Sequence, residues 1–243
     1  MKTLFFKEIK DFFNSIIGYL VIIVYLLINC MFMWIFKGNW NIFDVGFANL
    51  DTLFMISPWI FLFLVPAITM NMFAGEFKSG TMELLLTRPL SEFQIVIAKY
   101  ASTLILVIIA LIPTLFFILS INFLAAPVGN IDFGAIIGSY FGLFFLAASY
   151  SAIGLFASSL SKNAIISFLL SIFLCYFFFL GFNNLAFLDF TGKIADFIKS
   201  LGIDDHYNSI SRGVIDTRDI IYFFSITALF IFLTKLRLES RKW

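Results

Sequence analysis

The chain has 243 residues, of which 61% are hydrophobic and 13% are charged, and its formal net charge is +1. Soluble domains carry about 25% charged residues, so the composition excludes a soluble protein and indicates a polytopic membrane protein. A chain without a basic excess offers no electrostatic surface for nucleic acid, and we expect no nucleic-acid partner. Cys30 and Cys175 both lie in apolar stretches, so neither a disulfide framework nor a metal site is predicted.

The N-terminal segment, residues 1–14, predicts an amphipathic helix that lies in the membrane interface. Its apolar residues at helical spacing are Phe5, Phe6, Ile9, Phe12 and Phe13. Lys7, Lys10 and Asp11 fall between them, and this mixture of charges, with no small-residue cleavage site, argues against a removable signal peptide. A fraying cytoplasmic tail is the alternative interpretation.

Six segments are long enough to cross the hydrocarbon core, which needs about 20 apolar residues. They are residues 16–36, 52–74, 95–124, 133–160, 164–184 and 220–236. These segments predict an all-α fold, with the whole chain, residues 1–243, forming one transmembrane domain.

Prolines interrupt two of these segments. Pro58 and Pro66 lie in the second segment and Pro113 lies in the third. Each removes a hydrogen bond of the helix, so we expect kinks at these positions. The kinks either permit movement of a helix pair or are purely structural, since proline is common in transmembrane helices.

The fourth segment contains a repeated small-residue pattern at Gly134, Gly138 and Gly142. Glycines four residues apart let another backbone approach the same helix face closely. We expect this face to pack within the subunit or against a second subunit.

The connection between the second and third segments, residues 79–90, is short, polar and broken at two points. Ser79-Gly80 can end the incoming helix, residues 81–87 can form about two helical turns, and Arg88-Pro89 ends them. The sequence therefore predicts a short helix that lies across the membrane surface.

A new helix is predicted directly after this connection. Ser91 is followed three residues later by Gln94, which is the spacing of a capping box. The third membrane segment should therefore start at this point.

The connection between the last two segments, residues 185–219, predicts a second amphipathic helix. Its apolar positions are Ile194, Phe197, Ile198 and Leu201. Gly202 is placed to end that helix, and the acidic residues of 216–219 are placed to cap the final span. His206 has no second histidine or cysteine nearby, so a hydrogen-bonded structural role is favoured over a metal ligand.

The distribution of basic residues predicts the orientation, because cytoplasmic loops are enriched in Lys and Arg. With both termini in the cytoplasm, eleven of the sixteen basic residues lie on the cytoplasmic side. The remaining five are Lys37, Lys193, Lys199, Arg212 and Arg218. Residues 79–90 are then cytoplasmic, and residues 185–219 are external.

Sequence motifs for independent chemistry are missing. The chain has no phosphate-binding Gly-x-x-x-x-Gly-Lys-Ser/Thr run, no HExxH, no CxxC and no Gly-x-Ser-x-Gly. We expect no charged residue or histidine well inside a span, whereas ion-coupled carriers usually need one. We therefore expect no catalytic, metal-binding or cofactor-binding residues and no ATPase site in this chain, so the free energy for any transport must come from elsewhere.

Two stretches of the chain, residues 75–91 and 206–219, resemble ABC-2 type transporter permeases. Within that family, they are most similar to the gliding-motility-associated permease subunits of the GldF type. The resemblance implies six transmembrane helices, a coupling helix and a location in the bacterial inner membrane. It also implies an ABC ATPase partner (GldA-like), a membrane-anchored auxiliary subunit (GldG-like) and a second permease copy. The function implied is export, or conformational work, driven by ATP hydrolysis.

The predicted ATPase-coupling residues are those of the short helix and its end. They are Thr81, Met82, Glu83, Leu84, Leu85, Leu86, Thr87 and Arg88. Glu83 and Arg88 are the candidates for polar contacts, although solvated loop charges are the alternative. A non-transporting membrane scaffold that recruits or is driven by an ATPase is the alternative function, and the substrate is not predicted.

Overall fold

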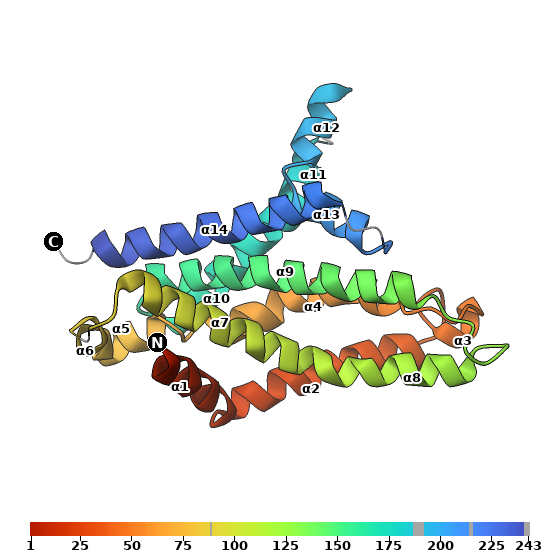
Figure 1. Cartoon of the computed structure of the whole chain (residues 1–243), viewed down its shortest axis with the longest axis horizontal. Helices are drawn as coiled ribbons and strands as arrows, with labels where there is room; N and C mark the ends of the chain where they lie inside the picture. The colour runs from red at the N-terminus through yellow and green to blue at the C-terminus, as the bar shows by residue number, and fades with distance from the viewer. Residues whose placement is uncertain (88, 187–191, 214–215, 241–243) are drawn as a thin grey trace.

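The computed structural model describes residues 1–87, 89–186, 192–213 and 216–240, and in these ranges it contains helices and no strands (Figure 1). The predicted all-α fold is therefore confirmed. Six helical stretches are long and apolar enough to span a membrane, as predicted. They cover Ile16–Ile35, Asp51–Ser79, Glu92–Leu124, Phe133–Leu160, Ala164–Ala186 and Thr217–Glu239.

Most spans are composed of more than one helical element. The first is α2 (Ile16–Cys30) continued by a π-helical turn, and the second is α4 (Asp51–Thr69) followed by α5 (Ala74–Ser79). The third joins α7 (Glu92–Leu111) to α8 (Leu115–Leu124), and the fifth joins α10 (Ala164–Tyr176) to α11 (Phe182–Ala186). Only α9 (Phe133–Leu160) and α14 (Thr217–Glu239) are single helices.

Five short helices complete the described part of the chain. They are α1 (Lys2–Phe13), α3 (Ile42–Val45), α6 (Thr81–Leu86), α12 (Lys193–Lys199) and α13 (Ile203–Ile210). The first of these is the predicted N-terminal amphipathic helix, and it packs against α7.

The centre of the bundle is α9, which contacts α4, α7, α10, α13 and α14. The most apolar stretches of α9 and of the α4–α5 span are 78% and 72% buried, against 22–33% in the other four spans. The outer helices expose many apolar side chains, as expected where lipid covers them.

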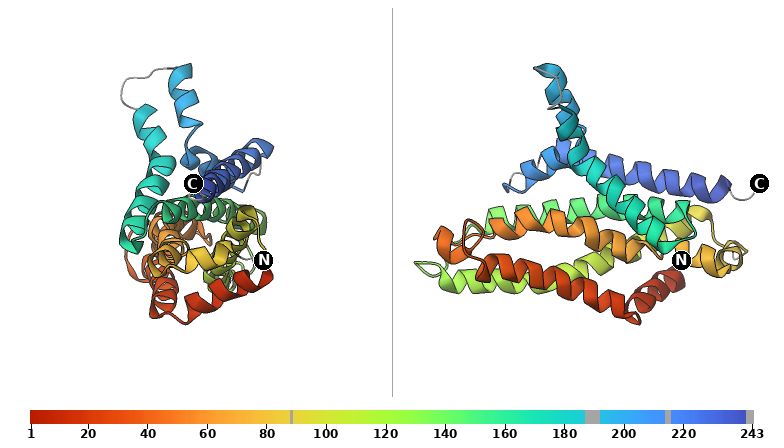
Figure 2. Two further views of the ribbon diagram at one scale, coloured as in Figure 1. Left: turned by 90° about the vertical axis from the view of Figure 1, so that its left-hand side faces the viewer. Right: turned by 180° about the vertical axis from the view of Figure 1, so that it is seen from behind.

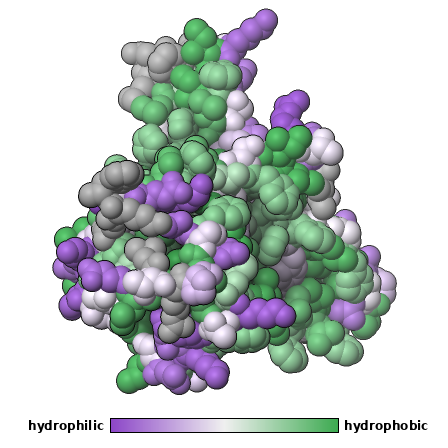
Figure 3. Space-filling view, turned by 60° about the vertical axis from the view of Figure 1, so that its left-hand side comes forward, coloured by the Kyte–Doolittle hydropathy of each residue, from purple (hydrophilic) through white to green (hydrophobic). Residues whose placement is uncertain are grey.

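The two ends of the bundle differ. One end carries Met1, α6 and the C-terminal end of α14, and we call it the α6 end; the opposite end carries α3, and we call it the α3 end (Figures 1 and 2). In Figure 3 the α6 end comes forward on the left, where hydrophilic side chains gather, whereas hydrophobic side chains cover much of the remaining surface.

The prolines occupy different local structures. α4 continues through both Pro58 and Pro66, whereas Pro113 lies in a 3-10 turn, Ile112–Thr114, between α7 and α8. Each proline removes one amide donor from its helix, and the helix type changes at Pro113 but not at Pro58 or Pro66.

The glycine face of α9 packs within the chain. A Cβ atom on Gly138 would lie 2.8 Å from the Cα of Gly213, and one on Gly142 would lie 3.2 Å from Cγ2 of Ile210. The face therefore receives α13 and the turn that follows it. Gly134 has only the side chain of Asp132 nearby.

The segment before the last span holds more helix than the sequence indicated. Beyond the predicted amphipathic helix, which is α12, the structure contains α13, whose apolar side chains Ile203, Tyr207 and Ile210 are buried. Gly202 was expected only to end a helix, but it is also the N-terminal cap residue of α13. Residues 187–191 and 214–215 lie outside the described part of the chain.

Candidate functional site

The short polar element between the second and third spans folds as the end of α5 and the helix α6, with a turn at Gly80 between them. α5 ends at Gly80, whose φ of +73° places it in the left-handed region that favours glycine. The hydroxyl groups of Ser79 and Thr81 are 2.8 Å apart across this turn, and the Ser79 hydroxyl also donates to the carbonyl of Gly75. The break between α5 and α6 is therefore determined locally.

The start of α7 is fixed in the same local way. The amide of Gln94 donates to Oγ of Ser91, and the amide of Ser91 donates to Oε1 of Gln94. Both bonds of the predicted capping box are present.

The side chains of α6 divide into an inner and an outer set. Met82 is only 4% exposed and belongs to the hydrophobic core, so the structure places it against the bundle and not on the surface. Glu83 is exposed, and Leu84 is 67% exposed. Leu85 is half-buried against the core.

The remaining predicted contact residues differ in how far the structure describes them. Thr81 and Thr87 are exposed, and the Thr87 hydroxyl donates to the carbonyl of Leu84. Leu86 is part of the helix, but its side chain lies outside the description, as does the whole of Arg88.

A buried charge cluster joins α5 to α1 and α7, and it consists of Lys7, Glu8, Glu76 and Lys99. Nζ of Lys99 is 2.6 Å from Oε1 of Glu8 and 3.1 Å from Oε1 of Glu76, and it also donates to the carbonyl of Met72. The Lys99 side chain is completely buried. Lys7, from the half-exposed face of α1, lies 3.0 Å from Glu76 and 3.4 Å from Glu8.

The cluster is balanced in charge. Two ammonium groups face two carboxylates, which is the condition under which ions are tolerated out of water. Burial alone lowers the pKa of Lys7, but Glu8 and Glu76 outweigh it, so its pKa is raised above the ordinary lysine value. The ring of Phe73 adds a cation–π contact, with Nζ of Lys99 5.2 Å from its centroid.

This cluster corrects one expectation from the sequence. No charge was expected well inside a span, yet Lys99 lies two turns inside α7, and Glu8 lies on the buried face of α1 beside Leu4. The sequence did contain a signal for the burial of Glu8. Glu8 follows Leu4 by four positions, so the two side chains share one face of α1.

The turn between α4 and α5 is held by a single hydroxyl from α9. Oγ of Ser158 accepts hydrogen bonds from the amides of Phe73 and Ala74 and donates one to the carbonyl of Met70. These bonds satisfy backbone groups that the break between α4 and α5 leaves without helical partners. Together with the charge cluster, they connect α5 to α1, α7 and α9.

His206 has the structural role that the sequence favoured. Its Nδ1 is 2.6 Å from Oδ1 of Asp219, its Nε2 is 2.9 Å from the carbonyl oxygen of Ser200, and its ring stacks on Tyr222. Within the described residues, no group of three or more His, Cys, Asp or Glu side chains is placed to hold a metal ion.

The arrangement offers hydrogen-bonding and apolar surface, and among the residues that the structure describes here no nucleophile lies in contact with a base. What it provides is a short helix, α6, that packs on α5 and is exposed on its outer face, while α5 is held to α1, α7 and α9. No curated protein matches the chain significantly. The family model described as ABC-2 family transporter protein matches residues 5–237, which is nearly the whole sequence. The chain therefore belongs to the ABC-2 transporter family, as a membrane-embedded component with six membrane-spanning helices.

Proposed function

We propose that the chain is the permease subunit of an ATP-driven transporter and that a separate ABC ATPase subunit docks on α6. The observation that carries this proposal is that α6 buries one face and exposes the other. Met82 lies in the core, whereas Leu84 is 67% exposed beside the exposed Glu83. An apolar side chain with a polar neighbour on an exposed helix suits the centre and rim of a protein interface.

The contacts of α5 supply a route for motion. A displacement of α6 acts on α5 directly, and Glu76 of α5 is joined to Lys99 of α7 and, through Lys7, to α1. Ser158 extends the same connection to α9 at the centre of the bundle. Closure of the ATPase subunits would therefore move several spans together, either to export a substrate or to do conformational work.

The finer assignments rest on the resemblance of residues 75–91 and 206–219 to gliding-motility permeases. On that basis we propose a role in gliding motility, a GldA-like ATPase, a GldG-like membrane-anchored subunit and a second permease copy. We also propose that the protein resides in the inner membrane with both termini, and hence the α6 end, in the cytoplasm. The predominance of basic residues near that end supports this orientation.

The experiment is to measure ATP hydrolysis by the complex with Leu84→Asp in the permease. A charge at the centre of the interface should reduce stimulated hydrolysis by at least about tenfold, because central apolar contacts dominate interface energies. Phe47→Asp is the matched control, since Phe47 is 71% exposed near the opposite end. Equal hydrolysis by the two variants and the unmodified complex would contradict docking on α6.

A further inference from the structure

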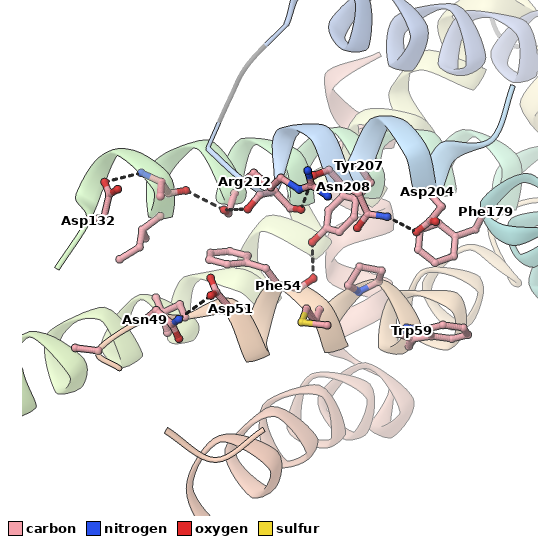
Figure 4. Close-up of a pocket in the computed structure, with 18 residues that line it drawn as sticks. Asn49, Asp51, Phe54, Trp59, Asp132, Phe179, Asp204, Tyr207, Asn208 and Arg212 are labelled. Atoms are coloured by element: carbon pink, nitrogen blue, oxygen red, sulfur yellow. Dashed lines mark hydrogen bonds between the residues drawn. The ribbon is translucent and has the colours of Figure 1, made fainter. Parts of the chain in front are cut away.

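A cavity of about 640 Å³ opens at the α3 end between α4, α9 and α13 (Figure 4). Its inner wall is aromatic, with Phe54, Trp59 and Phe179, and the ring of Trp59 meets that of Phe179 edge to face. The hydroxyl of Tyr207 donates to the carbonyl of Phe54, which ties α13 to α4 across one side. We call this space the outer cavity.

Charged side chains also line the outer cavity. Three carboxylates, Asp51, Asp132 and Asp204, line it together with a single basic residue, Arg212. Asp204 already accepts hydrogen bonds from Asn183 and from Asn208, so it is held in place.

A second space of about 640 Å³ runs between α2 and α4, and its lining contains no charged residue. Val24 and Ile28 of α2 face Ile60 and Phe63 of α4 across it. We call this space the apolar groove. Its volume, like that of the outer cavity, lies within the usual range for small-molecule sites of about 300–1,000 Å³.

The two spaces share the side chains of Met55 and Trp59 as walls. These residues and Phe63 recur every four positions on α4, and they are 57%, 49% and 59% exposed on a helix that is otherwise mostly buried. These three side chains therefore form a stripe on α4 that runs from the outer cavity to the apolar groove. Trp59 lies at the junction, where an amphipathic ring is favourable.

We infer that the outer cavity and the apolar groove together form one binding site for an amphiphile. Its hydrocarbon tail would occupy the groove, and its head group would occupy the outer cavity. Because carboxylates outnumber the arginine by two in the lining of the outer cavity, the head group that fits is an ammonium. This inference deepens the proposed function, since it names the class of substrate that such a permease would move.

The test uses the fluorescence of Trp59, which lies where tail and head would meet. Replacing Trp34, Trp40 and Trp243 with Phe leaves Trp59 as the only tryptophan. The protein is placed in lipid nanodiscs, and an alkyltrimethylammonium with a brominated tail is titrated against an alkyl sulfate with the same tail. We expect saturable quenching by the ammonium at a concentration at least tenfold lower than by the sulfate.

Two pairs of variants separate a site from general partition into the bilayer. Asp51→Asn combined with Asp204→Asn should weaken ammonium binding at least tenfold, whereas Asp196→Asn, an exposed carboxylate outside the cavity, should not. Val24→Phe, which narrows the groove, should weaken binding, whereas Ile23→Phe on the adjoining lipid-facing position should not.

Quenching that does not saturate, or that is the same for both head groups and all variants, would show that ordinary bilayer lipid fills the groove and would overturn the inference. Binding is measured without ATP or an ATPase. A failure of this test therefore leaves the docking of an ATPase on α6 untouched, and a failure of docking leaves this test valid.

Discussion

Substitution of Lys99 by methionine tests whether the charge cluster holds the α6 end together. Methionine keeps most of the side-chain length but removes the ammonium group. Glu8 and Glu76, whose side chains are 8% and 10% exposed, would then face each other with Lys7 as their remaining cation.

The expected cost follows from that imbalance. Removing one partner of a buried ion pair typically destabilises a protein by about 3–5 kcal/mol. Lys7 stays within 3.4 Å of both carboxylates and is half exposed, so we expect a loss near the lower limit, about 3 kcal/mol. Adding Glu8→Gln restores one cation to one carboxylate and should recover part of the loss.

The assay is the free energy of unfolding of the purified chain, measured by titration with dodecyl sulfate in mixed micelles. Lys235→Met is the matched control, because Lys235 makes a partly exposed pair with Glu239 one helical turn away on α14. Such pairs contribute about 0.3–0.5 kcal/mol. If Lys99→Met costs no more than Lys235→Met, or if Glu8→Gln brings no recovery, the cluster does not have the structural role assigned to it.

Three further predictions concern packing, orientation and pH. Gly138→Leu should lower the free energy of unfolding by about 1–3 kcal/mol, because a Cβ atom there would lie 2.8 Å from the Cα of Gly213. Gly134→Leu should cost less, since only the side chain of Asp132 lies near Gly134. Equal unfolding curves for the two variants would contradict this prediction. In a cysteine-free background, a cysteine at Ser79 should be shielded from an impermeant thiol reagent in intact cells and one at Ser200 should react; the reverse pattern would invert the orientation. Burial raises the pKa of Asp204 above the ordinary aspartate value of about 3.9. Because only the ionised carboxylate attracts an ammonium, ammonium binding should be complete above the raised pKa. Binding should weaken as the pH falls through that pKa, so the decline should begin at a pH above the ordinary value. A pH profile unchanged by Asp204→Asn would show that this carboxylate does not contribute.

Features encoded by neighbouring residues were predictable from the sequence. The six spans follow from hydropathy, and the short helix α6 follows from Gly80 and the capping box at Ser91, which act over three or four residues. The amphipathic helix α1 likewise follows from its own periodicity.

Features that depend on distant residues were not predictable. Lys99 meets Glu8 across 91 positions and Glu76 across 23, and neither pairing leaves a local pattern. The inward direction of Met82 also depends on how α5 and α6 pack, since its neighbours in sequence give no preference for either face. The helix α13 was missed because Asp204, Asp205 and Asn208 make its sequence look like a polar loop.

Photo-crosslinking from the outer face of α6 can capture the ATP-binding protein that we propose docks there. A benzophenone amino acid placed at Leu84, whose side chain is 67% exposed, should crosslink in native membranes to one polypeptide that binds ATP. The same amino acid at Phe47, near the α3 end, should not capture that polypeptide. Crosslinking from Leu84 to lipid alone, or capture of the same ATP-binding protein from both positions, would contradict the account.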